Sequence, residues 1–142
     1  MYHVENPAGR LIEVKLASPL SVDEVQQFAQ KHIALMQKIP GGKYVGLVNL
    51  LEAYVFPPAV AESLAKLLSG AASHVERSAY LIGESAVFSL QVERVIRDAN
   101  NPNRRAFRHA PEAVTWLSEI LTPGERREAE RFVREATALV RH

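Results

Sequence analysis

An apolar run, Tyr44-Val45-Gly46-Leu47-Val48-Asn49-Leu50, lies in the first half of the chain. It has no charged residue and few polar ones, which is typical of a strand that is covered on both faces of its sheet. A second run of this kind spans residues 78–83, with Ala79-Tyr80-Leu81-Ile82 at its centre. A helical pattern separates the two runs. We therefore predict that they are neighbouring inner strands, joined by a right-handed crossover beneath amphipathic helices.

Three further strand signals flank these runs. Residues 1–5 are predicted to form a short edge strand, and the turn signal Asn6-Pro7-Ala8-Gly9 follows it. In residues 11–17 the side chains alternate between two faces, so this segment is expected to pair with the first as a hairpin. Arg105-Ala106-Phe107-Arg108 is expected to be a short strand with Phe107 pointing inward.

Capping signals predict five helices. Ser21-Val22-Asp23-Glu24 is a capping box that opens the first helix. Pro57-Pro58 opens the second helix, and Ser85 caps the third. Residues 110–121 form the fourth, and Thr122-Pro123-Gly124-Glu125 opens a final amphipathic helix. The expected apolar stripe of the first helix consists of Val25, Phe28, Ala29, His32, Ile33 and Met36.

The resulting order of elements is β, β, α, β, α, β, α, β, α, α. It predicts an α/β fold with a single, mostly parallel, mixed five-stranded sheet, helices around it, and an extra C-terminal amphipathic helix. Residues 1–121 are expected to form one domain. The helix in residues 122–142 is expected to pack on that domain or on a second copy, which would give a homodimer.

Composition excludes several classes of function. The 142 residues carry a net charge of only +1, which argues against nucleic-acid binding. The chain has no cysteine, so disulfides and thiolate chemistry are excluded. No apolar run is long enough for a membrane span, and the first residues lack the pattern of a signal peptide. We therefore expect a cytoplasmic protein.

Three segments together carry a family resemblance. They are Leu11-Ile12-Glu13-Val14-Lys15-Leu16, the central strand at 45–50, and residues 105–117, where a short strand with Phe107 is followed by Glu-Ala-x-x-Trp-Leu. Over residues 1–121 the layout resembles the STAS domain, in the SpoIIAA-like branch of bacterial anti-sigma-factor antagonists. The final helix lies outside this resemblance.

The resemblance implies a regulatory protein-interaction module and not a catalyst. Phospho-switch members of the family carry a serine after the central strand, at the start of the next helix. Here that junction, residues 51–58, contains no Ser or Thr, so no phosphorylated residue is assigned. This branch also has a distant similarity to lipid-carrying folds, which implies a carrier or sensor of a small apolar ligand as the alternative.

The best candidate site follows the strand at 44–50, because α/β folds bind their ligands at the carboxyl edge of the sheet. Tyr54 is expected to be exposed there. Phe56 either anchors a partner or packs inward at the start of the next helix. The residues expected at this edge for a protein partner or a ligand are Glu52, Tyr54, Phe56, Glu84 and Ser85.

A group of arginines is the second candidate. It would hold a phosphate, an acidic protein surface or an anionic lipid, unless it is only a solvated basic face near a helix end. The candidate anion patch consists of Arg94, Arg97, Arg104, Arg105 and Arg108.

Catalytic, cofactor and metal motifs are mostly missing. Gly83-Glu84-Ser85-Ala86 is similar to a nucleophile elbow but lacks its last glycine, so helix capping is the preferred role of Ser85. A hydrolase that uses Ser85 with His109 is the remaining enzymatic hypothesis. His32 is expected to be a partly buried histidine with its hydrogen bonds satisfied. The sequence has no nucleotide-binding glycine motif, and its five histidines are far apart, so we expect no cofactor, no metal and no enzymatic activity.

Overall fold

The sheet is mixed and mostly parallel, as predicted. In the computed structural model, residues 1–140 are described, apart from the side chain of Val140; residues 141–142 of the predicted C-terminal segment lie outside the described residues. The strands follow one another in the order β1-β2-β3-β4-β5, with β1 antiparallel to β2 and the other neighbours parallel. The five strands are β1 (Tyr2–Ala8), β2 (Leu11–Leu16), β3 (Tyr44–Asn49), β4 (Val75–Leu81) and β5 (Arg104–Phe107).

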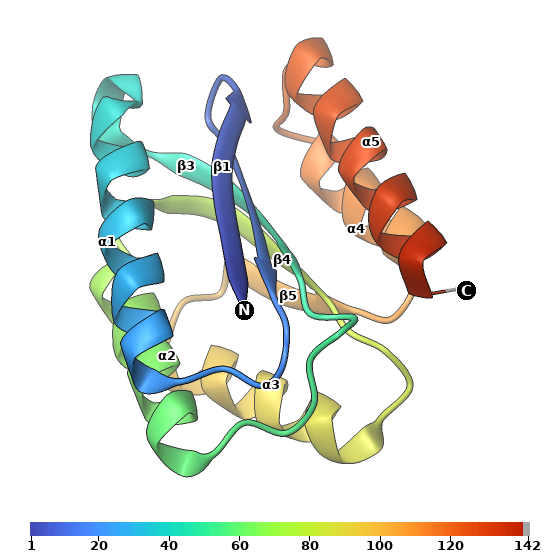
Figure 1. Cartoon of the computed structure of the whole chain (residues 1–142). Helices are drawn as coiled ribbons and strands as arrows, with labels where there is room; N and C mark the ends of the chain where they lie inside the picture. The colour runs from blue at the N-terminus through green and yellow to red at the C-terminus, as the bar shows by residue number, and fades with distance from the viewer. Residues whose placement is uncertain (141–142) are drawn as a thin grey trace.

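The helices cover both faces of this sheet (Figure 1). Successive parallel strands that lie in sequential order, with crossovers of one hand, place their connecting helices on the same face. Accordingly α1, α2 and α3 pack on one face, whereas α4 and α5 pack on the other. The helices are α1 (Val22–Lys38), the 3-10 turn η1 (Pro40–Gly42), α2 (Pro58–Gly70), α3 (Ala86–Asp98), α4 (Ala110–Ser118) and α5 (Pro123–Val140).

The predicted caps are present. Ser21 and Glu24 form a complete capping box at the start of α1. The Ser85 hydroxyl accepts a hydrogen bond from the backbone N–H of Phe88, 3.2 Å away, at the start of α3. Thr122 and Glu125 exchange the same reciprocal pair of bonds at the start of α5. Local sequence signals therefore determine where these helices begin.

Two strands begin earlier than predicted. The strand predicted at 78–83 is β4, which starts at Val75, and β5 starts at Arg104. The charged residues at these two starts do not fit the apolar pattern of an inner strand. In the structure they have partners from distant parts of the chain. Arg77 donates to the carbonyl of Trp116 and pairs with Glu119.

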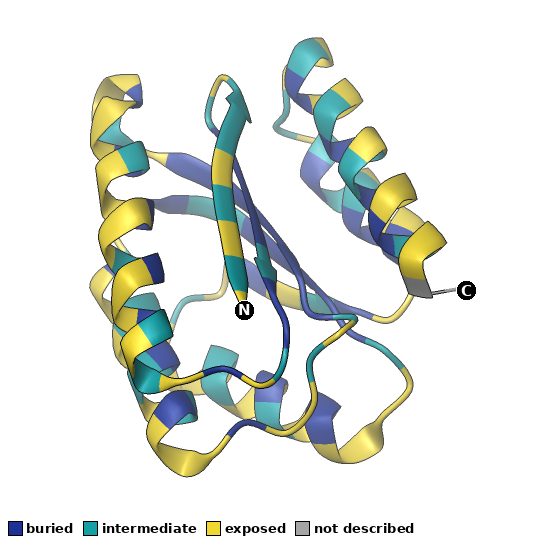
Figure 2. Cartoon of the chain, in the orientation of Figure 1, coloured by how far each residue is buried: buried dark blue, intermediate teal, exposed yellow. Residues whose placement is uncertain are grey.

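The apolar stripe of α5 is covered by its own chain. Ala129, Val133 and Ala136 are buried against the sheet and α4, in a cluster that includes Leu11 and Leu117. Figure 2 shows the buried positions of α5 on the side that faces the sheet. The C-terminal helix thus packs on the domain. A homodimer through this helix stays a prediction, without the support that an uncovered stripe would give it.

A carboxyl group is buried beneath α5. Glu13 of β2 is only 1% exposed, and its Oε2 has no hydrogen-bond partner. Burial is the main cause that raises its pKa to about 8, and the nearby charges of Glu5 and Glu128 raise the pKa further. Glu13 is therefore largely protonated in the folded protein at neutral pH.

We predict that Glu13→Gln stabilises the protein in a pH-dependent way. The unfolded chain loses the Glu13 proton near pH 4.5, whereas the folded protein keeps it to about pH 8. The stability that the neutral Glu13 carboxyl retains at low pH is therefore lost as pH rises through this window. A glutamine at this position does not titrate, so the variant does not show this loss. Chemical denaturation should show the variant gaining roughly 5 kcal/mol over the wild type between pH 4.5 and pH 8.

Glu62→Gln is the matched control for this prediction, because Glu62 is an exposed carboxylate on α2. Its difference from the wild type should change little with pH. A flat difference for Glu13→Gln as well would contradict the raised pKa.

Candidate functional site

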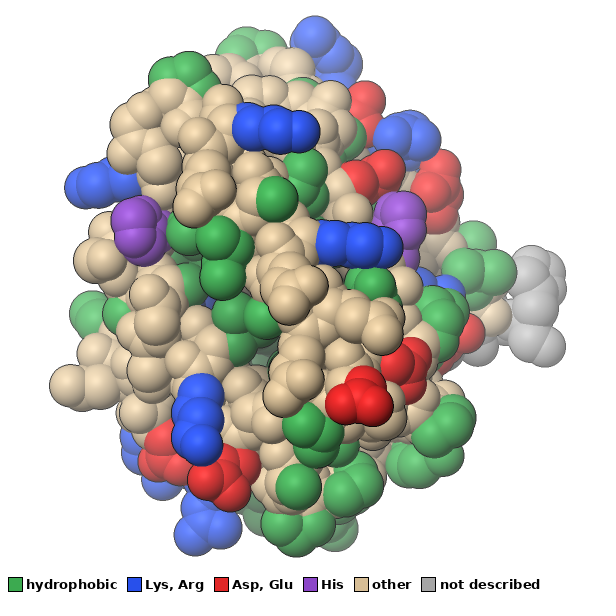
Figure 3. Space-filling model, turned by 60° about the vertical axis from the view of Figure 1, so that its left-hand side comes forward, with side chains coloured by type: hydrophobic (Ala, Val, Ile, Leu, Met, Phe, Trp, Pro, Cys, Tyr) green, Lys and Arg blue, Asp and Glu red, His purple; other side chains and the backbone are tan. Residues whose placement is uncertain are grey.

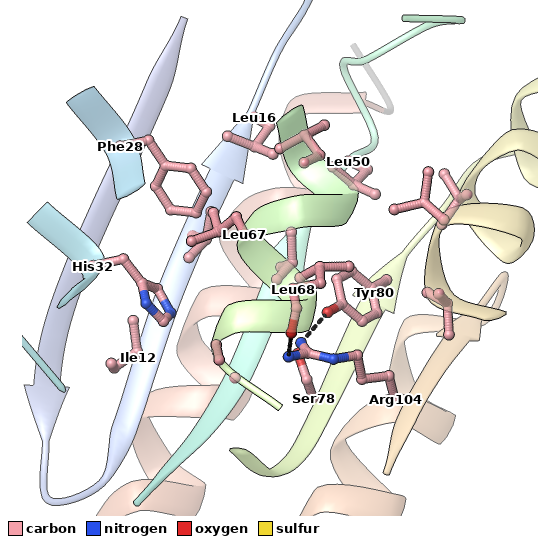
Figure 4. A pocket seen from close by; sticks show the side chains of 18 of the residues that line it. Ile12, Leu16, Phe28, His32, Leu50, Leu67, Leu68, Ser78, Tyr80 and Arg104 are labelled. Atoms are coloured by element: carbon pink, nitrogen blue, oxygen red, sulfur yellow. Dashed lines mark hydrogen bonds between the residues drawn. The ribbon is translucent and has the colours of Figure 1, made fainter. Parts of the chain in front are cut away.

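A cavity lies between the sheet and the layer of α1, α2 and α3 (Figure 4). Its volume is about 70 Å³. The walls are mostly apolar, with Leu64, Leu67 and Leu68 from α2 facing Val92 and its neighbours on α3. The side chains of β2 that point to this face form the floor. The cavity therefore belongs to the hydrophobic core on the three-helix side of the sheet.

The cavity is not sealed from the outside. Leu67 and Leu68 of α2, and Val95 and Ile96 of α3, line it but are only half-buried. The space-filling view shows a small hollow, bordered by hydrophobic side chains, on the side of the molecule that carries α1 and α2 (Figure 3). Small movements of these flexible side chains would widen the entrance.

Arg104 is the charged group in the cavity wall. It is only 5% exposed, and its Nη1 donates to the Tyr80 hydroxyl 2.7 Å away. Its Nη2 donates to the carbonyl of Leu68 at 3.0 Å, but Nε has no partner. Burial lowers the pKa of Arg104, but the oxygens of Tyr80 and Tyr44 raise it by more, so that the pKa lies above its ordinary value. The guanidinium is therefore positively charged.

His32 of α1 faces the same cavity. Its ring lies edge-on to Tyr44, with 4.8 Å between ring centroids, and also contacts Phe28. His32 is 6% exposed and its Nδ1 has no hydrogen-bond partner, so the expected burial is confirmed but the expected satisfaction of its hydrogen bonds is wrong. Burial first, and the charge of Arg104 second, lower its pKa to about 4. The imidazole is neutral at neutral pH.

We predict that His32 makes the protein sensitive to acid. The unfolded chain takes up the proton near pH 6.5, whereas the folded protein resists it until about pH 4. Stability that is present above pH 6.5 is therefore lost as pH falls through this window. The loss should be roughly 3 kcal/mol, and His32→Leu should abolish it in denaturation experiments.

His109→Gln serves as the control, because His109 is exposed. This variant should keep the acid sensitivity of the wild type. An unchanged pH profile in His32→Leu would mean that another group is responsible.

Of the residues predicted at the edge after β3, Phe56 lies in the cavity wall and Tyr54 lies at the surface. Phe56 is buried, lines the cavity and packs on Phe88 with 5.4 Å between ring centroids. The amide of Gln91 bonds both the N–H and the carbonyl of Phe56, which ties this loop to α3. Tyr54 is 62% exposed, as predicted. Phe56 therefore packs inward and is not a surface anchor.

The other edge residues have structural partners or face solvent. The carboxylate of Glu52 pairs with Lys15 at 2.5 Å. Glu84 is exposed, and Ser85 is the N-cap of α3. Within residues 1–140 no hydrogen bond joins Ser85 to His109, and the hydroxyl of Ser85 is used in capping.

The five arginines do not form one patch. Neighbouring residues on a strand point to opposite faces of the sheet. Arg104 therefore points into the cavity, whereas Arg105 lies over the ring of Trp116 on the α4 side, 5.0 Å from its centroid. Arg94, Arg97 and Arg108 are exposed. The prediction of a single anion patch is wrong because it ignored this alternation.

The cavity itself was missed from the sequence, because its residues come from seven helices and strands that are far apart in the chain. One signal was present. A strand in a sheet covered on both faces buries alternate residues on each side. With Phe107 facing one helix layer, the position three residues earlier must face the other. This argument would have placed Arg104 inside the protein.

Other kinds of site are not apparent in the described part of the chain. Within residues 1–140, no three His, Asp or Glu side chains gather closely enough to hold a metal ion. In the same range, no helix combines the length and the apolar character that a membrane crossing requires. These observations leave the cavity as the most distinctive feature of the structure.

The chain matches no protein-family model and no curated protein sequence. The similarity to STAS domains therefore stays a prediction from the sequence pattern. The function has to be argued from the cavity and from the surface.

Proposed function

We propose that the protein binds a small apolar ligand in the cavity between the sheet and helices α1 to α3, as a carrier or sensor. The cavity is the observation that carries this proposal, because its wall is almost entirely apolar and the side chains of α2 and α3 that line it are in part only half-buried. Pockets for small molecules are commonly of this kind, with a few polar groups at defined points. Arg104, Tyr80 and His32 are such groups here.

The free energy of the cavity supports this proposal. Protein interiors are packed about as densely as organic crystals, and an empty cavity costs about 24 cal/mol per Å³. A volume of about 70 Å³ then costs roughly 2 kcal/mol of stability. A ligand that fills the space recovers this free energy on binding.

The volume of the cavity limits the size of a ligand that can bind without movement of the lining side chains. An apolar cavity of about 150 Å³ holds a benzene molecule. At about 70 Å³, this cavity accepts a longer molecule only when the half-buried side chains at its rim turn outward. Leu67 and Ile96 are such side chains. A ligand with a narrow aliphatic body fits these conditions best.

We propose that this activity is non-enzymatic and cytoplasmic. Ser85, the hydroxyl proposed as a nucleophile, caps a helix and does not line the cavity. His32 is in the cavity, but its low pKa makes it a poor base at neutral pH.

The cavity predicts a difference between two valine-to-phenylalanine variants of α3. Val92 lines the cavity and is buried, whereas Val87 on the same helix is exposed. Val92→Phe should fill the space and weaken binding of 1-octanol at least about tenfold, because the larger ring takes the volume of the ligand. Val87→Phe should bind 1-octanol like the wild type. Binding is followed by NMR chemical-shift changes at the lining residues.

Native mass spectrometry of gently purified protein extends this test to ligands from the cell. The wild type and Val87→Phe are expected to carry the same bound mass, and Val92→Phe should lack it. Equal 1-octanol binding by all three proteins at sites outside the cavity, or no binding by any of them, would overturn the proposed function.

A second candidate is a protein-interaction module, as the resemblance to STAS domains implies. The observation that favours it is a set of exposed apolar side chains at the carboxyl edge of the sheet. Tyr54 and Val55 follow β3, and Val87 and Leu90 lie in the first turns of α3. Phe56 connects the two groups by its contact with Phe88 and its bonds to Gln91. Aromatic and aliphatic residues of this kind anchor protein partners.

We predict that Tyr54→Ser combined with Leu90→Ser releases a protein partner that the wild type retains in quantitative affinity purification. Both side chains are exposed, so folding stability should change by less than about 0.5 kcal/mol. Ile33→Ser removes an exposed apolar side chain from α1, outside this edge, and should retain the partner. Equal retention by all three proteins would argue against this candidate.

A further inference from the structure

Arg104 is a buried cation whose partners within the protein are neutral. It bonds the Tyr80 hydroxyl and the Leu68 carbonyl, the oxygen of Tyr44 also favours its charged form, and the groups that shift its pKa include no carboxylate. A charge taken out of water is costly unless an opposite charge or several hydrogen bonds compensate it. A guanidinium, moreover, cannot become neutral by losing its proton. Within residues 1–140 the guanidinium is therefore stabilised by neutral oxygens and has no carboxylate as a counter-ion.

The unpartnered Nε of Arg104 indicates which chemical group of a ligand would pair with the guanidinium. Nε has no partner, whereas Nη1 and Nη2 each use one N–H on Tyr80 and Leu68. The N–H groups that remain lie in the plane of the guanidinium, where arginine binds the two oxygens of a carboxylate side by side. A carboxylate matches both the charge and the geometry of this group.

The rest of the cavity defines the body of the ligand. Figure 4 shows Arg104 and Ser78 at one end of the cavity, and Leu16 and Leu50 at the other. The wall between them is apolar, so one end recognises an anion and the other excludes water. A free inorganic anion would leave this apolar space unfilled, and a neutral hydrocarbon would leave Arg104 without a counter-ion.

We infer that the ligand is an apolar monocarboxylate, whose carboxylate binds Arg104 and whose aliphatic body lies along the cavity towards Leu16 and Leu50. This inference rests on the proposed function and names the chemical class of its ligand. The Tyr80 hydroxyl accepts a hydrogen bond from Nη1 of Arg104 and so orients the guanidinium. His32 lies close enough to Arg104 for its pKa to be lowered by that charge.

His32 provides a readout that needs no mutation. An anion bound to Arg104 offsets the positive charge that lowers the pKa of the imidazole. The pKa of His32, followed by NMR, should therefore rise when octanoate binds. It should stay unchanged when 1-octanol binds, because the alcohol has the same chain without the charge. The groups that face His32 are Arg104, Tyr44 and Phe28, so a shift reports on this end of the cavity.

The decisive experiment compares octanoate with 1-octanol on the full-length wild type and two variants. The wild type should bind octanoate about tenfold or more tightly than 1-octanol. Arg104→Gln should lose this preference while it still binds 1-octanol. Arg105→Gln, the neighbouring residue on the other face of β5, should keep the preference of the wild type. Acetate should bind far more weakly than octanoate.

The outcomes separate this inference from the proposed function. Equal binding of octanoate and 1-octanol by the wild type overturns the carboxylate and leaves the apolar cavity site standing. Binding of acetate as tight as that of octanoate overturns the apolar body. Binding of neither octyl compound overturns the proposed function as well. If Arg104→Gln does not fold, the wild-type preference and the His32 titration still decide the question.

Discussion

The burial of β3 and β4 on both faces is the constraint on which the rest of the structure depends. Every residue of β3 is buried, so the sheet needs a helical layer on each side. Sequential strand order with crossovers of one hand places α1, α2 and α3 on one face. The other face would then be open. Helices α4 and α5 close it, which makes α5 a part of this fold and not an appendage to it.

The two helical layers fit the sheet differently. On the α4 and α5 side, small residues such as Ala113 and Ala129 are fully buried in one cluster with Leu11, Val45 and Leu47 of the strands. On the other side, a cavity remains between the sheet and the helices, lined by larger side chains such as Leu64, Leu67 and Phe56. Gly46 and Ser78, which are small and paired across β3 and β4, add room on this side. The candidate site is thus a consequence of how one layer packs.

The sequence was sufficient for the fold because its signals are local. The capping boxes at Ser21 and Thr122 and the apolar run of β3 depend only on neighbouring residues. The candidate site depends on contacts between segments that are distant in the chain. Local sequence patterns therefore do not place its residues correctly. Arg104 was grouped with Arg105, although one residue of separation on a strand sends the two side chains to different layers. The direction of Phe56 does not follow from its neighbours in the sequence, because Gln91 and Phe88 of α3 hold it inward.

Two buried charges on opposite faces of the sheet show why only one of them indicates a ligand. Glu13 lies beneath α5 without a hydrogen-bond partner for Oε2, but a carboxyl group can take up a proton, and its raised pKa shows that burial favours this neutral form. Arg104 has no such neutral form at accessible pH. Its charge persists inside an apolar wall, beside a histidine whose own pKa it lowers. Glu13 can therefore be explained within the fold alone, whereas the permanent charge of Arg104 is the observation on which the proposed carboxylate ligand rests.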